Sequence, residues 1–149
     1  GANIKKLLKK YPHSIVNGID YSIVSVEKSK KVNNKAVAEG RCTVLKGNVM
    51  NMPYSATCFD AVTAFETIYF WQDLPKCFCE IYRVLKPGGT FLICNEVSGD
   101  EAKDEKWTKI IEGMTIYKDT ELKTYLGQAM FRNIQIRKKN NWLCVTAEK

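Results

Sequence analysis

The apolar residues of this chain change their spacing repeatedly, and this alternation limits the folds open to it. Short apolar runs that are typical of buried strands lie at 14–19, 42–45, 59–65 and 90–94. Between them, apolar residues recur every three or four positions, as on one face of a helix. Strands that alternate with helices are joined by crossovers, so the pattern predicts an α/β fold with a doubly wound, mostly parallel sheet.

The last part of the chain has a different pattern, which predicts an antiparallel hairpin. Ile134 and Ile136 alternate with polar residues, Asn140-Asn141 forms the turn, and 142–147 returns as a second strand. Asp119 or Thr120 is expected to cap the helix before this hairpin, as Ser22 and Asp73 cap earlier ones. The helices are predicted at about 3–10, 22–39, 73–85, 103–113 and 119–130.

Length and composition are those of one ordinary folded domain. The chain has 149 residues, of which 45% are hydrophobic and 26% are charged. No apolar run approaches the roughly 18 residues that a membrane span needs. Residues 1–10 are basic and lack the apolar core of a secretory signal. We therefore expect neither a membrane span nor secretion.

The six cysteines do not have the spacing of a metal site or a disulfide framework. Cys42, Cys94 and Cys144 lie in strand-like runs, where cysteine acts as a small apolar residue. Cys77 and Cys79 are two positions apart on a predicted helix and so point to different sides. We expect no metal, no structural disulfide and a reduced, cytoplasmic protein.

The formal charge of +7 comes mainly from lysine clusters at 5–6, 9–10 and 28–31, together with the basic run 137–139. A positive field of this kind attracts nucleic acid or anionic surfaces. No aromatic residues interleave with the basic ones, as stacking on single-stranded nucleic acid requires. We interpret the clusters as a solvated surface and keep nucleic-acid binding as the less favoured alternative.

Polar side chains follow the predicted strands, at the edge where open parallel sheets bind ligands. Asp20 follows the first strand, and its carboxylate suits the two hydroxyls of a ribose, although an acid there also caps a helix. Asn48 offers the donor and acceptor that suit adenine, and is also an ordinary turn residue. Phe65-Glu66 and Asn95-Glu96 follow the other two strands.

Other candidate features favour packing over chemistry. The aromatic run 69–71 would form either a wall beside a ligand or plain core packing. Residues 86–89, Lys-Pro-Gly-Gly, are predicted to form a turn without chemical contacts. His13, the single histidine, has no nucleophile partner nearby in the sequence.

Five segments, in order, match one known family: 18–22, 46–54, 59–62, 80–90 and 128–131. Together they resemble class I S-adenosylmethionine-dependent methyltransferases, in particular the small-molecule group around the ubiquinone and menaquinone C-methyltransferases. The most specific match, Glu-Ile-Tyr-Arg-Val-Leu-Lys-Pro-Gly-Gly at 80–89, is similar to the family's E-x-x-R-V-L-K-P-G-G segment. The resemblance covers nearly the whole chain.

The resemblance implies a Rossmann-like fold, with residues 1–149 as the C-terminal portion of a single methyltransferase domain. It implies S-adenosylmethionine as the cofactor and methyl transfer to a small-molecule acceptor. No catalytic residue is assigned, although Glu66, Tyr69 and Glu96 lie where a base would reach an acceptor, and 97–118 is expected on the acceptor side. The residues expected to bind the cofactor are Gly1, Asp20, Tyr21, Ser22, Asn48, Val49, Phe65 and Glu66.

The chain departs from the family pattern in two ways. Asn48 stands where aspartate is commoner. The family's first strand and glycine-rich loop are absent, and Gly1 looks like the last glycine of that loop. In the family's strand order, 3-2-1-4-5-7-6, the missing strand is central and lies between the strands that end at Asp20 and Phe65. We therefore expect the C-terminal portion of a longer enzyme and an interrupted sheet.

Three other functions stay open. A noncatalytic methyltransferase-like scaffold is favoured by Asn48 and by the missing loop. A nicotinamide-dependent dehydrogenase also places an acid after its second strand, but the segment at 86–89 and the terminal hairpin argue against it. A nucleic-acid methyltransferase fits the charge, but Phe-Glu-Thr at 65–67 replaces the Asn-Pro-Pro-Tyr motif of amino-group methylation.

Overall fold

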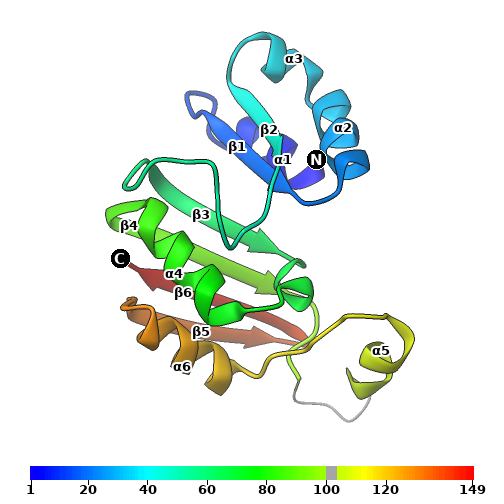
Figure 1. The fold of residues 1–149 in the computed structure, drawn as a ribbon, viewed down its shortest axis with the longest axis vertical. Coiled ribbons are helices and arrows are strands. Elements are labelled where there is room, and N and C mark those ends of the chain that lie inside the picture. The colour runs from blue at the N-terminus through cyan, green and yellow to red at the C-terminus, as the bar shows by residue number, and fades with distance from the viewer. Residues whose placement is uncertain (100–103) are drawn as a thin grey trace. The chain divides into compact units, whose positions relative to one another are not determined.

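The computed structural model describes residues 1–99 and 104–149, which form two compact units (Figure 1). Unit 1 comprises Gly1–Pro53 and unit 2 comprises Tyr54–Lys149. The prediction that residues 1–149 form a single domain stays a prediction. Within the described residues, no helix is long and apolar enough to cross a membrane.

Unit 1 is built around two parallel strands. They pair in register from Val16 opposite Cys42 to Asp20 opposite Lys46. A small apolar cluster on the helices and strands, which includes Leu8 and Val26, forms its core. The elements of unit 1 are α1 (Ala2–Lys10), β1 (Val16–Asp20), α2 (Ile23–Val32), α3 (Asn34–Ala38) and β2 (Cys42–Lys46).

The single helix expected between Ser22 and Glu39 is wrong, because it is divided into α2 and α3 at Asn33. Asn33 is buried, and its side-chain amide donates to the carbonyl oxygens of Gly1 at 3.0 Å and Ser29 at 2.9 Å. Asparagine side chains that bond to nearby backbone compete with the helical ladder. The interruption therefore ties α2 to the start of α1.

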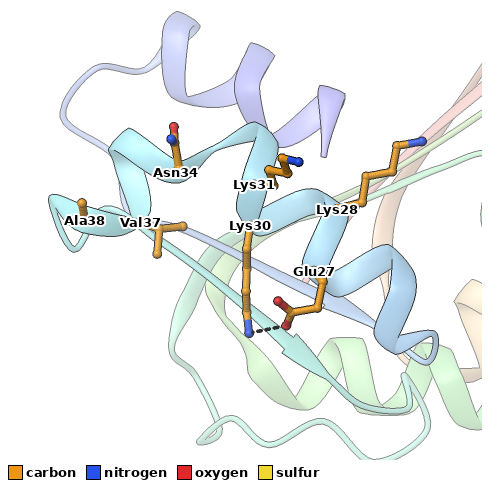
Figure 2. A pocket seen from close by; sticks show the side chains of 7 residues that line it. All are labelled: Glu27, Lys28, Lys30, Lys31, Asn34, Val37 and Ala38. Carbon is orange, nitrogen blue, oxygen red and sulfur yellow. Dashed lines mark hydrogen bonds and ion pairs between the residues drawn. The ribbon is translucent and has the colours of Figure 1, made fainter.

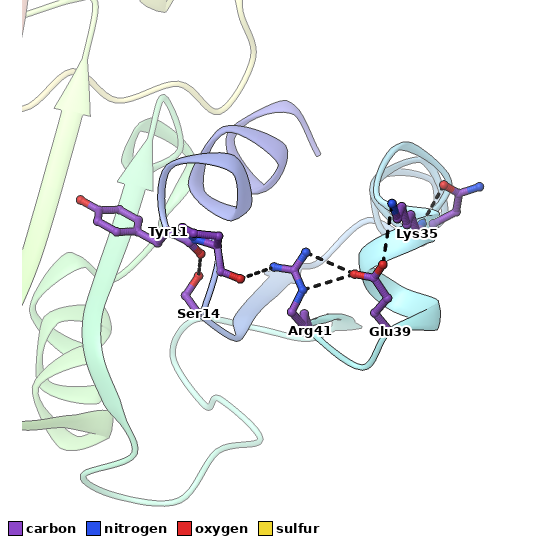
Figure 3. Close-up of polar contacts among 7 residues, drawn as sticks. Tyr11, Ser14, Lys35, Glu39 and Arg41 are labelled. Atoms are coloured by element: carbon purple, nitrogen blue, oxygen red, sulfur yellow. Dashed lines mark hydrogen bonds and ion pairs between the residues drawn. The ribbon is translucent and has the colours of Figure 1, made fainter.

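Polar contacts join the loops at the beginning of the two strands (Figure 3). The Arg41 guanidinium donates to the Pro12 carbonyl oxygen at 3.2 Å and to the Glu39 carboxylate at 3.3 Å. The Ser14 hydroxyl donates to the Tyr11 carbonyl oxygen at 2.7 Å. These groups are exposed, so each contact adds little stability, but together they order the entry to the sheet.

Unit 2 contains one four-stranded mixed sheet in the order β3-β4-β6-β5. The β3 and β4 strands are parallel, and both pairs involving β6 are antiparallel. Helices α4 and α6 lie over one face of the sheet (Figure 1). The elements are β3 (Phe59–Phe65), the short 3-10 helix η1 (Ile68–Phe70), α4 (Leu74–Val84), β4 (Leu85–Asn95), α5 (Glu105–Ile110), α6 (Asp119–Gln128), β5 (Arg132–Lys139) and β6 (Trp142–Glu148).

The predicted turn at 86–89 lies inside β4 as an outward bulge. The strand pairs with β3 at Leu85 and then again from Thr90 onward, so the residues between them leave the ladder. Gly88 has φ +75°, a left-handed conformation that favours glycine. The predicted turn at 86–89 is therefore wrong: these residues belong to β4, which extends further toward the N-terminus than its apolar run.

The start of α6 differs from the sequence prediction. Lys118, rather than Asp119 or Thr120, precedes α6, and its N–H donates to the Glu121 carboxylate at 2.9 Å. The predicted start of the preceding helix near Lys103 lies outside the described residues. The Asp73 cap of α4 is confirmed by a 3.0 Å hydrogen bond from the N–H of the third helical residue.

The α/β fold with parallel pairs and a final antiparallel hairpin is confirmed. Among the described residues, the strands form two separate sheets. No described strand pairs with both β1 and β3, and the missing central strand stays a prediction.

The core of unit 2 depends on aromatic packing between α4 and β4. Phe78 is fully buried, and its ring meets Phe91 edge-on, with centroids 5.5 Å apart. We expect Phe78→Ala to lower the free energy of unfolding of unit 2 by about 3–5 kcal/mol. Urea titration followed by tryptophan fluorescence measures this, because all three tryptophans lie in unit 2.

The matched control is Ile110→Ala, which also truncates an apolar side chain but at a position that is 69% exposed. It should cost no more than about 0.5 kcal/mol. Equal losses in the two variants would contradict the packing assigned to Phe78.

Candidate functional site

The carboxyl ends of β1 and β2 place the first group of predicted residues. The Asp20 carboxylate accepts the Ser22 N–H at 2.9 Å, and the Asp20 carbonyl oxygen accepts the Gly47 N–H at 2.9 Å. The Ser22 hydroxyl oxygen accepts the Ser25 N–H at 3.4 Å, which confirms its predicted cap. Because a carboxylate has about four acceptor positions, the Asp20 turn leaves capacity for ligand hydroxyls.

Tyr21 and Asn48 lie in the turns that follow these strands. Tyr21 is 75% exposed. The Asn48 side-chain oxygen accepts the Met50 N–H at 2.9 Å, and its carbonyl oxygen accepts the Asn51 N–H at 3.0 Å. A ligand that used Asn48 as an acceptor would therefore share that oxygen with the turn. Val49 lies half-buried in the same turn.

Gly1 is placed by packing against α2. A Cβ atom there would lie 2.9 Å from the Ser29 Cα, so a side chain would force the backbone apart. This close packing alone explains why residue 1 is glycine. The role of Gly1 in cofactor binding stays a prediction.

The second group of predicted residues lies at the ends of β3 and β4. Phe65 ends β3 opposite Cys94 of β4. Glu66 follows with φ 54°, and its N–H donates to the Cys94 carbonyl oxygen at 3.0 Å. The Glu66 carboxylate accepts the Glu96 N–H. Thus the Glu66 side chain lies across the ends of both strands, in a backbone conformation that is uncommon outside glycine.

The surroundings raise the pKa of the Glu66 carboxyl. Although the residue as a whole is exposed, its carboxylate is partly withdrawn from water, and this desolvation is the largest cause. The negative charge of Glu96 raises the pKa further, while the hydrogen bond from the Glu96 N–H lowers it. Glu66 is therefore a better proton acceptor near neutral pH than an ordinary glutamate.

Tyr69 has a different chemical role available. It is buried, and its hydroxyl oxygen accepts the Val97 N–H at 3.0 Å. Burial raises the pKa of the phenol well above its usual value. The hydroxyl therefore keeps its proton at neutral pH, which suits a donor or a structural group rather than a base.

Two buried polar side chains lie close in sequence to the end of β4. Asn95 is 1% exposed and Asp104 is 2% exposed. The Oδ1 atom of each side chain has no hydrogen-bond partner among the described residues. The other Asp104 oxygen accepts the Gly99 N–H at 3.1 Å. Sequence analysis identified Asn95 as a strand-end residue but did not single out Asp104, which lies inside the predicted helix at 103–113.

A depression on α2 and α3 contains none of the predicted site residues (Figure 2). Its rim carries lysines, and Lys30 pairs with Glu27 at 3.0 Å. These lysines belong to the predicted solvated lysine surface, and binding of an anionic partner there stays a prediction. The lining residues are Glu27, Lys28, Lys30, Lys31, Asn34, Val37 and Ala38.

The helical cysteines lie as predicted. Cys77 is fully buried on α4 and Cys79 is exposed, so the two thiols lie on different sides of the helix. Within the described part of the chain, no three His, Cys, Asp or Glu side chains are grouped to hold a metal ion.

The fold and the strand-end residues agree with a family assignment made from sequence. A family model described as "Methyltransferase domain" matches residues 1–93. The chain therefore belongs to the methyltransferase domain family, which confirms the predicted class I S-adenosylmethionine-dependent family.

Curated relatives include cycloartenol-C-24-methyltransferase 1 of Oryza sativa subsp. japonica, 36% identical over 86 residues, or 58% of this chain and 25% of the relative. Demethylmenaquinone methyltransferase of Symbiobacterium thermophilum is 36% identical over 87 residues, or 58% of this chain and 34% of that protein. The matched segments span about a quarter to a third of these relatives.

A solved structure extends the similarity of fold to the whole chain. Phosphoethanolamine N-methyltransferase 2 of Haemonchus contortus, in complex with S-adenosyl-L-methionine, has a TM-score of 0.85 at 15% identity. The similarity covers 100% of this chain and 46% of the other.

We expect the Glu66 carboxyl to titrate above its usual pKa of 4.5. The folded chain then holds this proton more tightly than the unfolded chain, so this group's contribution to stability falls as pH rises from about 4.5 through the raised pKa. A carbon-13 NMR titration of labelled glutamates measures the pKa directly, and Glu66→Gln assigns the resonance.

Glu96→Gln tests whether the negative charge of Glu96 contributes to the raised pKa of Glu66. It removes the neighbouring negative charge and should shift the Glu66 titration to lower pH while leaving it above the usual value. A Glu66 titration at or below 4.5 in the wild-type chain would contradict the assigned environment.

Proposed function

We propose that this chain is the C-terminal portion of a methyltransferase domain that transfers a methyl group from S-adenosylmethionine to a small-molecule acceptor. The observation that carries the proposal is Asp20 at the carboxyl end of β1, beside a parallel partner strand. Ligands of open parallel sheets bind at this edge, and a strand-end acid is suited to ribose hydroxyls. Membership of the methyltransferase domain family supports the same reaction.

The proposed cofactor contacts follow from the chemistry of each group. In unit 1, Asp20 would accept the ribose hydroxyls, and Tyr21 would lie against the adenine. Asn48 and Val49 would face the base from the second turn. Ser22 would hold the Asp20 carboxylate in place, because its N–H donates to that carboxylate.

Three further residues, Gly1, Phe65 and Glu66, are proposed to bind the cofactor. S-adenosylmethionine supplies the activated methyl group when bound. The protein's own work is to align the acceptor for in-line displacement and to exclude water.

Glu66 is the proposed base wherever the acceptor must lose a proton. Its raised pKa and its place across two strand ends support this role more than Tyr69, whose hydroxyl is buried and keeps its proton. A catalytic base is not required for every acceptor, because many acceptors react through a lone pair or a double bond.

The acceptor is proposed to be partly apolar. The described part of the expected acceptor segment carries Trp107, which is 39% exposed, and Met114. Relatives named as cycloartenol and demethylmenaquinone methyltransferases support an acceptor with apolar character. We also propose a reducing cytoplasmic location, which six free cysteines support.

We further propose that a strand from outside residues 1–149 completes the sheet. The two separate sheets among the described residues support this proposal. The matches to only 25% and 34% of two curated relatives support it as well.

A noncatalytic methyltransferase-like scaffold is the second candidate. Its support is Asn48, where the family commonly has aspartate and where the side-chain oxygen is already engaged by the Met50 N–H at 2.9 Å. An asparagine also lacks the charge that strengthens a hydrogen bond to the ligand.

Calorimetric titration with S-adenosylhomocysteine tests the proposed function. It compares residues 1–149 with a longer version that includes any residues encoded upstream. We expect micromolar binding by the longer version and weaker binding by residues 1–149 alone. In the version that binds, Asp20→Asn should weaken the affinity roughly tenfold to a hundredfold, because it replaces charge-assisted hydrogen bonds.

Glu39→Gln is the matched control, since it also neutralises an acid of unit 1, but one in surface ion pairs with Arg41 and Lys35. It should leave the affinity within twofold. Equal binding by both versions would refute the need for another strand. Absence of binding by either version would favour the scaffold.

A further inference from the structure

Cys94 and Cys144 form a close thiol pair that the proposed methyl transfer does not use. They lie directly opposite each other on the antiparallel strands β4 and β6. Their sulfur atoms are 2.9 Å apart, and both thiols are free and half-buried.

The backbone places the two residues within reach of a covalent link. Directly opposite residues of an antiparallel pair have Cα atoms about 4.5–5.5 Å apart. A disulfide needs a Cα separation of about 4.4–6.8 Å. The two side chains also leave the sheet on the same face, because opposite residues in a ladder share a face. No strand has to change register to form the bond.

We propose that Cys94 and Cys144 are a reversible modification site, at which a low-molecular-weight disulfide such as glutathione disulfide forms an intramolecular bond between them. This inference does not rest on cofactor binding. In a reducing compartment the pair would remain as two thiols and would become linked only when the glutathione pool is oxidised.

The exchange proceeds in two balanced steps. The Cys144 thiol loses its proton to water and attacks one sulfur of glutathione disulfide, which forms a mixed disulfide and releases one glutathione thiolate. Cys94, after losing its own proton, attacks the Cys144 sulfur and releases the second glutathione. Two protein thiols are oxidised by two electrons, and one glutathione disulfide is reduced to two glutathione molecules.

The assigned order follows from the environment of Cys94. Burial, and then the hydrogen bond with Cys144, raise its pKa to about 12, so its thiolate is scarce at neutral pH. Cys94 is therefore suited to the second step, which is intramolecular. The Cys144 sulfur already lies in contact with Cys94, and this offsets the low thiolate fraction of Cys94, because well-oriented groups have a very high effective concentration.

The link would act on the strand that positions Glu66. Cys94 pairs with Phe65 on its other side, and its carbonyl oxygen accepts the Glu66 N–H at 3.0 Å. Oxidation would thus join β6 covalently to the residue that holds the Glu66 backbone.

Peptide mapping of the folded 149-residue chain tests the proposal. The chain is equilibrated with mixtures of reduced and oxidised glutathione, its remaining thiols are blocked, and it is digested with trypsin without reduction. Cleavage after Arg83, Lys103 and Lys139 gives peptides 84–103 and 140–149, each with a single cysteine. We expect these two peptides to be linked in the oxidised sample and separate after dithiothreitol, with a mass loss of two hydrogens in the intact chain.

Two variants serve as controls. Cys144→Ser should abolish the linked peptide, and Cys79→Ser, which removes an exposed thiol, should leave it unchanged. Tryptophan fluorescence in each mixture shows whether the chain stays folded. Linkage only under conditions that unfold the chain, or glutathione attached to Cys144 without linkage, would overturn the proposal, as would linkage to a different cysteine.

Discussion

The parallel pairing of strands is the constraint on which the candidate site depends. Two parallel strands end at the same edge of a sheet, so the side chains that follow them are brought together without a dedicated motif. In unit 1 this pairing sets Asp20 beside the turn of Asn48, and in unit 2 it sets Glu66 beside Glu96. The chemistry of each edge is therefore a consequence of backbone topology.

The sequence predicted the fold well where local patterns decide structure. The change of apolar period placed the strands, and the side chains of Ser22 and Asp73 identified two helix starts. It failed where distant contacts decide. The break at Asn33 depends on the carbonyl oxygen of Gly1, which lies 32 positions earlier in the chain. Such a contact has no local pattern.

The candidate site was predicted by residue type but not by environment. Asp20 and Glu66 were both identified as acids after strands, but no sequence pattern indicated that the Glu66 carboxylate is partly desolvated beside the negative charge of Glu96. The burial of Asp104 is a further example, since charged side chains are rarely fully buried. Burial and neighbouring charge depend on tertiary packing, which single-residue patterns do not contain.

The strand order of unit 2 also has a consequence for how this unit folds. Strand β6 follows β5 in sequence but lies between β4 and β5 in the sheet. Hence β5 cannot join the sheet until β6 has paired with β4, across a separation of 50 residues at Cys94 and Cys144. The β5–β6 hairpin, whose contacts are local, would form early and dock as a piece, so its docking would limit the folding rate.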